Sequence, residues 1–264
     1  MELIKQLREM TGAGMVDCQK ALQEAGNDLE KAVEILRKKG IAKAAKRTDR
    51  DTNEGIVKVA VNSEQTEAYI LELNSETDFV ARNEKFQTLA EAIFQVVKAT
   101  KPADLEALLV APMTAGTVKE NLDGLSGTIG EKMGIKRFAI VTGATVAAYS
   151  HLGGRMGVLV ALDQPGKAEL AMDIAMQVAA VNPKYLVPAE VDPAEMAKEK
   201  EIYKAQLIKE GKPEAMVDKI VEGKMGKYYS EVCLVEQEYI KDDKKKVKDI
   251  LSGINVLQFV RYSL

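Results

Sequence analysis

The chain has 264 residues, enough for two compact domains, and 46% hydrophobic with 29% charged residues is an ordinary composition for a folded protein. No apolar run reaches the roughly 18 residues that span a membrane, and a net charge of −3 argues against general attraction to nucleic acid. The two cysteines lack disulfide or zinc spacing, and the single histidine excludes a multi-histidine metal site. We therefore expect no cofactor. The start of the chain lacks a signal-peptide core, and together with the cysteine usage this predicts a reducing, cytoplasmic location.

Residues 1–40 are predicted to form three short helices, because apolar residues recur there at helical spacing. The first helix ends at a glycine-rich turn that comprises Gly12, Ala13, Gly14 and Met15. Asn27 opens an N-D-L-E run and is expected to cap the third helix. Residues 41–54 are small and charged, which predicts a solvated linker that is helical at first.

From Gly55 the apolar period changes from helix to strand. Two runs of strand-forming residues, joined by a polar loop near 62–65, predict an antiparallel hairpin that ends at Asn74. A helix is expected over 84–100, followed by helical pieces at 104–122 and 128–133. A strand at 137–141 is expected to complete this half of the core.

The connection between this hairpin and the helix reads N-S-E-T-D-F-V from Asn74 to Val80. Thr77 and Asp78 are turn and cap formers, and Phe79 is a large apolar residue in a polar turn. One interpretation is that Thr77 or Asp78 caps the helix and Phe79 staples it to the core. The other is that Asp78 and Phe79 point outward, as a charge beside an aromatic wedge.

The second half of the chain repeats the first. An ungapped alignment places Leu89–Leu105 over Leu170–Leu186, and the apolar positions of one helix and its stop coincide. This predicts an α+β core of two antiparallel-sheet-plus-helix halves, at 55–141 and 142–264. The second copy has Asp163-Gln-Pro-Gly166 where the first has Thr77-Asp78-Phe79, so the turn of the first copy is special.

An insertion at about 191–231 interrupts the second half. It reads as two charged helices joined at Gly211, which predicts an antiparallel coiled-coil arm. We expect Met196, Tyr203 and Leu207 to face Met216, Ile220 and Val221 across it.

Three motifs in the chain resemble those of bacterial translation elongation factor Ts. They are Thr11-Gly-Ala-Gly-Met-Val-Asp-Cys-Gln-Lys-Ala-Leu22, Thr77-Asp78-Phe79-Val80 after an L-E-L-N strand, and His151 followed by Gly154-Arg-Met-Gly-Val-Leu-Val160. The resemblance implies a UBA-like fold for 1–40, a two-part core and a protruding coiled-coil arm. It also implies a nucleotide exchange factor, without catalytic chemistry of its own, whose partner is the GTPase elongation factor Tu. Some relatives carry a C-terminal helical module with no counterpart in this sequence, so we expect no contact from such a module.

The resemblance also implies roles for particular residues. It assigns displacement of the magnesium ion in the partner GTPase to Thr77, Asp78, Phe79 and Val80. It places His151 in the partner interface, and it implies that the N-terminal helices, with Gly12, Ala13, Gly14 and Met15, rest on the GTPase.

Two other classes of protein compete with this interpretation. Basic residues Lys43, Lys46 and Arg47, and the run Lys244–Lys246, suggest RNA binding, against which the acidic composition argues. Asp78, Glu72 and His151 suggest an enzyme, but no nucleophile–base pair or cofactor loop accompanies them. No direct nucleic-acid binding is therefore expected.

Overall fold

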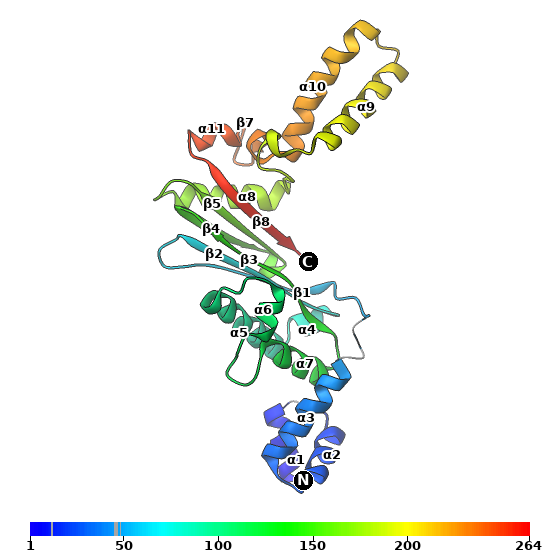
Figure 1. Ribbon diagram of the computed structural model, residues 1–264, viewed down its shortest axis with the longest axis vertical. Helices are drawn as coiled ribbons and strands as arrows, with labels where there is room; N and C mark the ends of the chain where they lie inside the picture. The colour runs from blue at the N-terminus through cyan, green and yellow to red at the C-terminus, as the bar shows by residue number, and fades with distance from the viewer. Residues whose placement is uncertain (12, 45–46, 48) are drawn as a thin grey trace.

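The protein is elongated, with a helical module at one end, a pair of helices at the other and a sheet core between them (Figure 1). The structure is a computed structural model, and it describes residues 1–11, 13–44, 47 and 49–264. Among these residues, no helix is long and apolar enough to cross a membrane.

The N-terminal module consists of α1 (Glu2–Thr11), α2 (Met15–Glu24) and α3 (Leu29–Ala44). Its small core includes Leu7, Cys18, Ala21, Leu22 and Ala32, all buried. Asn27 does not cap α3, contrary to expectation. The side chain of Asp28 accepts a hydrogen bond from the amide of Lys31 at 3.0 Å, while Asn27 has a φ of 65° and belongs to the turn that follows α2.

The helix α3 joins the module to the core, because it continues past Gly40 and packs on α7 (Val118–Ile129). The two backbones meet at glycines: a Cβ on Gly127 would lie 2.2 Å from the Cα of Gly40. Arg37 adds an ion pair to Glu120 on α7 at 2.8 Å. The crossing therefore depends on the absence of a side chain at Gly127.

The first half of the core is the antiparallel sheet β1 (Glu54–Val61), β2 (Glu67–Ser75) and β3 (Met133–Thr142), with β2 in the centre. Between β2 and β3 come α4 (Asp78–Ala81), α5 (Glu84–Thr100), α6 (Leu105–Val110) and α7. The hairpin and α5 lie where the sequence predicted them. The helix predicted at 128–133 is wrong, because Gly130 ends α7 with a left-handed φ of 96° and β3 begins at Met133.

The second half is the sheet β4 (Thr145–His151), β5 (Met156–Leu162) and β8 (Val256–Ser263), again with the middle strand flanked on both sides. The other elements are η2 (Leu152–Gly154), α8 (Ala168–Val181), η3 (Pro188–Glu190), η4 (Leu234–Glu236), β6 (Glu238–Tyr239), β7 (Asp242–Lys246) and α11 (Val247–Leu251). The basic run Lys244–Lys246 forms the end of β7, and α11 starts directly after it at Val247.

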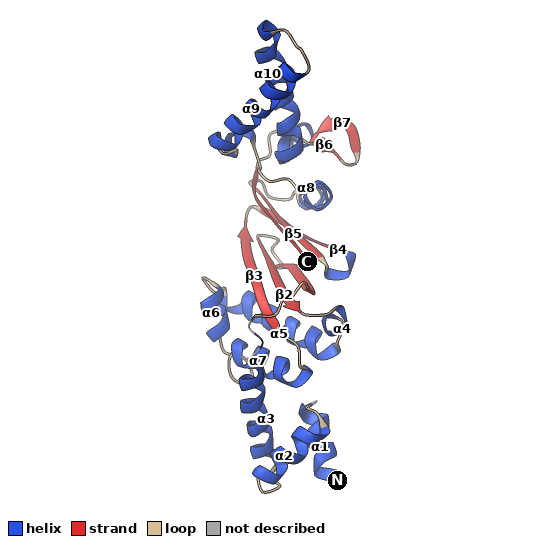
Figure 2. Cartoon of the chain, turned by 90° about the vertical axis from the view of Figure 1, so that its right-hand side faces the viewer, coloured by secondary structure: helices blue, strands red, loops and turns tan. Residues whose placement is uncertain are grey.

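The two sheets pack face to face between outer layers of helices (Figure 2). Successive side chains of β2 point to opposite faces of the sheet. Leu71 and Leu73 pack toward α5, whereas Ile70 lies between the two sheets. A Cβ on Gly157 would approach a methyl group of Val59 to 2.6 Å, so the sheets meet closely at that point.

The halves repeat one another in detail, which confirms the predicted duplicated α+β core. Ile93 on α5 and Ile174 on α8 are both fully buried, as the alignment of the sequences requires. Each helix ends at an aligned residue in the left-handed conformation, Lys101 with φ 45° and Asn182 with φ 51°, followed by a proline. The N-terminal helices and the antiparallel sheets likewise agree with the predicted class.

The inserted arm consists of α9 (Pro193–Lys209) and α10 (Glu214–Val232), which run back along each other away from the core (Figure 1). Leu207, Val217, Val221 and Met225 are buried between them. Met216, expected in this seam, is exposed, because the apolar stripe of α10 instead runs through Val217. The supercoil of a coiled coil stays a prediction.

The base of the arm is fixed by the carboxylate of Glu195, which we call the Glu195 hub. It accepts hydrogen bonds from the hydroxyls of Tyr185 at 2.7 Å and Tyr228 at 2.5 Å, and pairs with Lys184 at 2.5 Å. These donors, Lys184 first, lower the pKa of Glu195 from 4.5 to about 2. The hub joins α9 to α10 and to the segment after α8.

Acid is expected to weaken this hub. Because the folded-state pKa of Glu195 is depressed, its stabilising contribution is present above the usual value of 4.5 and is lost as the pH falls toward about 2. The melting temperature of the parent should exceed that of Glu195→Gln at neutral pH, and the difference should shrink through this window. Thermal scans at several pH values measure it. Glu201→Gln, at an exposed position of α9, is the control, and a pH-independent difference for Glu195→Gln would contradict the assignment.

Candidate functional site

The four residues Thr77–Val80, which we call the exposed turn, connect β2 to α5 through the short helix α4. Thr77 is the N-cap of α4, and its hydroxyl accepts a hydrogen bond from the amide of Val80 at 3.4 Å. Val80 and Ala81 are buried against the first half of the core. The exposed turn is thus anchored at its C-terminal end by the buried side chain of Val80 and by that of Ala81, which follows it.

Phe79 points into solvent, with 83% of the residue exposed. The staple interpretation is therefore wrong for Phe79, although the capping interpretation is right for Thr77. The carboxylate of Asp78 is partly exposed and pairs with Arg82, one helical turn later, at 3.0 Å. A charged group and an unpaired aromatic ring consequently stand side by side on the surface.

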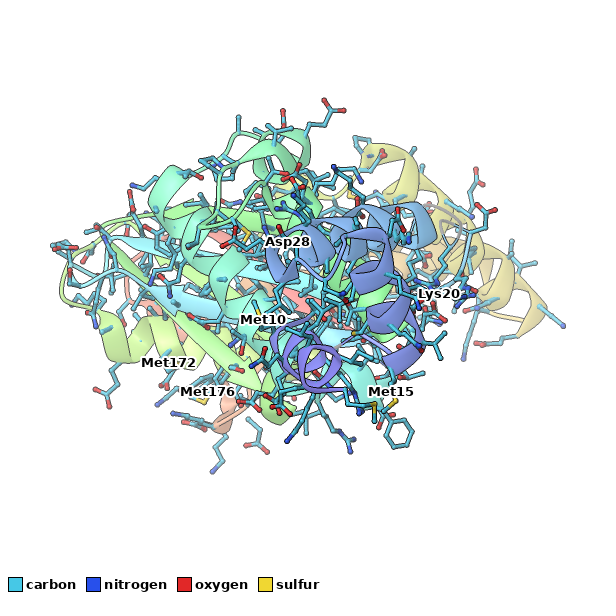
Figure 3. The ribbon with its side chains drawn as sticks, turned by 90° about the horizontal axis from the view of Figure 1, so that it is seen from below. Met10, Met15, Lys20, Asp28, Met172 and Met176 are labelled. Carbon is cyan, nitrogen blue, oxygen red and sulfur yellow. The ribbon has the colours of Figure 1, made fainter. Side chains whose placement is uncertain are left out.

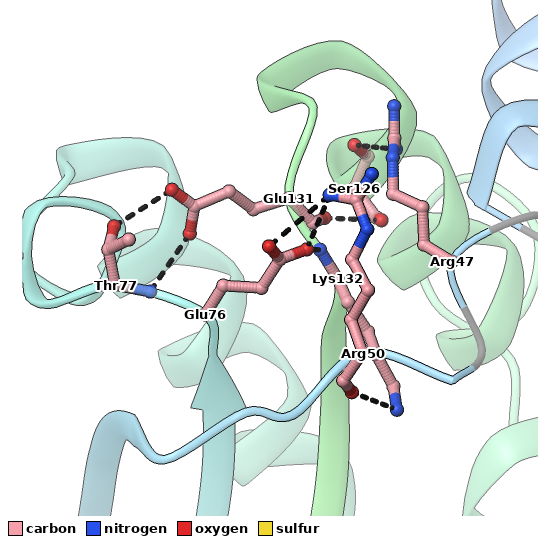
Figure 4. Close-up of polar contacts among 7 residues, drawn as sticks. All are labelled: Arg47, Arg50, Glu76, Thr77, Ser126, Glu131 and Lys132. Carbon is pink, nitrogen blue, oxygen red and sulfur yellow. Dashed lines mark hydrogen bonds and ion pairs between the residues drawn. The ribbon is translucent and has the colours of Figure 1, made fainter.

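Glu131, just before β3, bonds the first residue of the exposed turn (Figure 4). The amide of Thr77 donates to Oε2 of Glu131 at 3.0 Å, and the Thr77 hydroxyl donates to Oε1 at 2.8 Å. Ser126 in turn donates to the carbonyl oxygen of Glu131 at 2.6 Å. Both carboxylate oxygens are therefore used to fix Thr77.

Glu76 makes a second connection beside the first (Figure 4). Its Oε1 accepts from the amide of Lys132 at 2.5 Å and from the guanidinium of Arg50 at 3.1 Å. The amide of Lys132, and then Arg50, lower the pKa of Glu76 below its usual value. Arg47 donates to the carbonyl of Ser126 at 3.0 Å. The segment after α3, the exposed turn and the start of β3 thus form one polar network.

The motif that starts at His151 lies at the same end of the core as the exposed turn. Gly154 packs against Ile56 of β1, where a Cβ would come within 3.0 Å of the Ile56 side chain. Arg155 pairs with Glu54 at 2.6 Å, and Glu54 is the register partner of Ser75 at the end of β2. Glu54, with a smaller effect from Asp78, raises the pKa of Arg155.

His151 itself is exposed at the end of β4, and its Nδ1 lies 2.8 Å from the hydroxyl of Tyr149, with which its ring stacks.

The N-terminal motif presents only part of itself to solvent. The side chain of Ala13 is buried in the core of the module, whereas Gly14 and Met15 are exposed. Gly12 lies outside the described residues. Met10 is also exposed, and Figure 3 shows Met10 and Met15 in the N-terminal module.

The alternatives raised by the sequence find little support in these side chains. Glu72 is fully buried on β2 and pairs with Arg137 at 2.7 Å and Lys136 at 3.0 Å, so it faces no substrate-sized opening. Arg47 and Lys246 are engaged in contacts with Ser126 and Glu236. The side chains of Lys43 and Lys46 lie outside the described residues. Among the described residues, no group of three or more His, Cys, Asp and Glu is placed to hold a metal ion.

Sequence comparison defines the class of protein. The family model described as "Elongation factor TS" matches residues 76–264, which include the exposed turn, and a second model described as "UBA/TS-N domain" matches residues 2–36. The chain therefore belongs to the elongation factor Ts family. Proteins of this family are nucleotide exchange factors for elongation factor Tu in translation elongation, and they act without catalytic chemistry of their own.

Two features of the site could not be found from the sequence. Glu131 is 54 residues from Thr77, and nothing in its local pattern marks it as a partner. Arg155 lies within a motif of the family, but its pairing with Glu54 depends on the packing of one half of the core on the other.

Proposed function

We propose that this chain binds the complex of elongation factor Tu with GDP and promotes release of GDP and its exchange for GTP, with a nucleotide-free complex as intermediate, in the cytoplasm. The observation that carries the proposal is the exposed turn, where a nearly fully exposed Phe79 stands beside a partly exposed carboxylate. Aromatic side chains, phenylalanine among them, are enriched in protein–protein interfaces relative to the rest of the surface.

The chemistry of the partner explains how such a turn acts. A P-loop GTPase holds its nucleotide through backbone amides, a lysine and a magnesium ion that bridges the phosphates. A carboxylate brought near that site changes the charge balance around the ion, and an inserted ring separates packed elements and moves the loops that they carry. We assign the first action to Asp78 and the second to Phe79, with Thr77 and Val80 holding the turn.

The other motifs would supply contacts that hold the partner. Gly14 and Met15 on the N-terminal module and His151 on β4 are exposed. α4 and α1 lie on the same side of the long axis (Figure 2). We therefore propose that the module, His151 and the exposed turn engage a single partner molecule, with Gly12 and Ala13 shaping the loop of the module.

The proposal is tested with elongation factor Tu that carries fluorescent GDP. Addition of this chain with excess unlabelled nucleotide should accelerate loss of the fluorescent nucleotide in a saturable manner. Unchanged release at concentrations that saturate any measured binding would overturn the exchange function.

Asp78→Asn is expected to slow GDP release several-fold at millimolar magnesium, because the substitution removes the charge and retains the shape. A tenfold change in rate corresponds to about 1.4 kcal/mol. The defect should narrow when a chelator removes the magnesium, since the ion that Asp78 opposes is then absent.

The matched control is Asp123→Asn on α7, which replaces another partly exposed acid that pairs with a basic residue one turn away. A defect of Asp78→Asn that is equally large with and without magnesium would show that the carboxylate acts elsewhere.

A further inference from the structure

The exposed turn cannot be ordered by its own secondary structure or by its most prominent side chain. α4 is only four residues long, and so short a helix is not stable in isolation. Phe79 contributes no core burial, because it is exposed. Val80 and Ala81 secure the end of the turn, so the position of Asp78 and Phe79 depends on what fixes Thr77.

Glu131 fixes Thr77 through both its amide and its hydroxyl, and the hydroxyl of Ser75 donates to the carbonyl oxygen of Thr77 at 3.0 Å. The same hydroxyl accepts from Val80, so the contact with Glu131 and the cap of α4 share one oxygen atom. Hydrogen bonds to an ionised carboxylate are stronger than those between neutral groups. Glu131 is itself restrained, since its carbonyl accepts from Ser126 and the next residue bonds Glu76.

We propose that Glu131 is a positioning residue for exchange: it orders the exposed turn in the free protein, before the partner arrives. This inference rests on the proposed function of the turn. Association pays for each group that must be ordered on binding, and a turn ordered in advance avoids that loss. Removal of the carboxylate should therefore weaken the productive encounter and leave the step that follows binding nearly unchanged.

The first test measures order in the free protein. Backbone ¹⁵N relaxation should give order parameters near 0.85 for residues 77–80 in the parent, as in other rigid segments, and below about 0.6 in Glu131→Ala. Glu131→Gln should stay near the parent, because its amide can accept from the Thr77 amide and donate to the Thr77 hydroxyl. Thr77→Val removes one contact with Glu131 and the cap of α4 but keeps the amide contact with Glu131, so it should give an intermediate value. Parent-like order in Glu131→Ala would overturn the inference.

The second test separates encounter from exchange. In the fluorescent-GDP assay, Glu131→Ala should raise the half-saturating concentration of the factor by roughly tenfold and change the rate at saturation by less than about twofold, since the ordering loss falls on binding. Glu131→Gln should restore the parent value. Glu106→Ala, at an exposed position of α6, is the matched control. A general loss of structure in Glu131→Ala would also lower the rate at saturation, and Glu131→Gln would not restore the half-saturating concentration.

The two proposals fail in distinguishable ways. If Phe79→Ala is defective and Glu131→Ala matches the parent in both tests, the inference about Glu131 is wrong and the function of the turn stands. If Phe79→Ala exchanges normally, the proposed function of the turn fails. In that case loss of order in Glu131→Ala would still support its positioning of Thr77, and unchanged order would refute it.

Discussion

Replacement of Phe79 by Ala is expected to slow GDP release from elongation factor Tu by about tenfold or more, a loss of at least ~1.4 kcal/mol in the barrier to release. Stability of the free protein should hardly change. Phe79 is 83% exposed, and exposed positions away from caps and buried networks usually change stability by no more than about 0.5 kcal/mol. Stopped-flow fluorescence and thermal unfolding measure the two quantities.

Phe86, at the start of α5, is the matched control for this prediction. It is fully buried in the first half of the core, so Phe86→Ala should lose about 3–5 kcal/mol of stability. Exchange per folded molecule should persist at low temperature. A large stability loss in Phe79→Ala with normal exchange would contradict the assignment of the wedge.

Phe79→Ala should also change how strongly GDP weakens the complex of the factor with elongation factor Tu. If the factor loosens the nucleotide by some ratio, the nucleotide loosens the factor by the same ratio. The complex of Phe79→Ala with elongation factor Tu should therefore be less sensitive to added GDP than the parent complex. Titration of GDP into the preformed complex measures this sensitivity.

The second large effect concerns the crossing of α3 and α7. Gly127→Ala would place a Cβ 2.2 Å from the Cα of Gly40, so the two helices must separate. Overpacking of this kind costs about 1–3 kcal/mol, and here the clash is with backbone, which cannot rotate away. We expect a lower melting temperature and faster proteolysis between α3 and β1.

Gly124, one turn earlier on α7, provides the control. A Cβ there meets nothing within 4 Å, so Gly124→Ala should be neutral or stabilising by up to about 1 kcal/mol, the helix preference of alanine over glycine. Equal stability of the two variants would show that α3 does not depend on close approach to α7.

The sequence predicted those parts of the fold that local signals determine. The apolar spacing of α5 gave its bounds, and the aligned helices both end at left-handed residues before a proline. Predictions failed where the residues that end or cap a helix had to be chosen among adjacent positions in the sequence. Asp28 rather than its neighbour Asn27 caps α3, and Gly130 ends α7 where a helix was expected at 128–133.

For the site, the sequence indicated the exposed turn but left open which way Phe79 points. Periodicity cannot decide this, because a four-residue helix has too few positions to define a face. The roles of Glu131 and Glu76 were not predictable, since each depends on contacts with residues 54 or 56 positions away in the chain. Only the folded sheet brings these segments together.

The Glu195 hub has a geometric consequence for the arm. α9 has 17 residues, which at about 1.5 Å per residue makes a lever of roughly 25 Å. A rotation of about 5° at its base would displace the tip by roughly 2 Å. Glu195 lies in the first turn of α9, where it accepts from the hydroxyls of Tyr185 and Tyr228 and pairs with the ammonium of Lys184. A small rotation at this point moves the far end of the helix the most. The direction in which the tip of the arm points is thus determined by a few hydrogen bonds at its base.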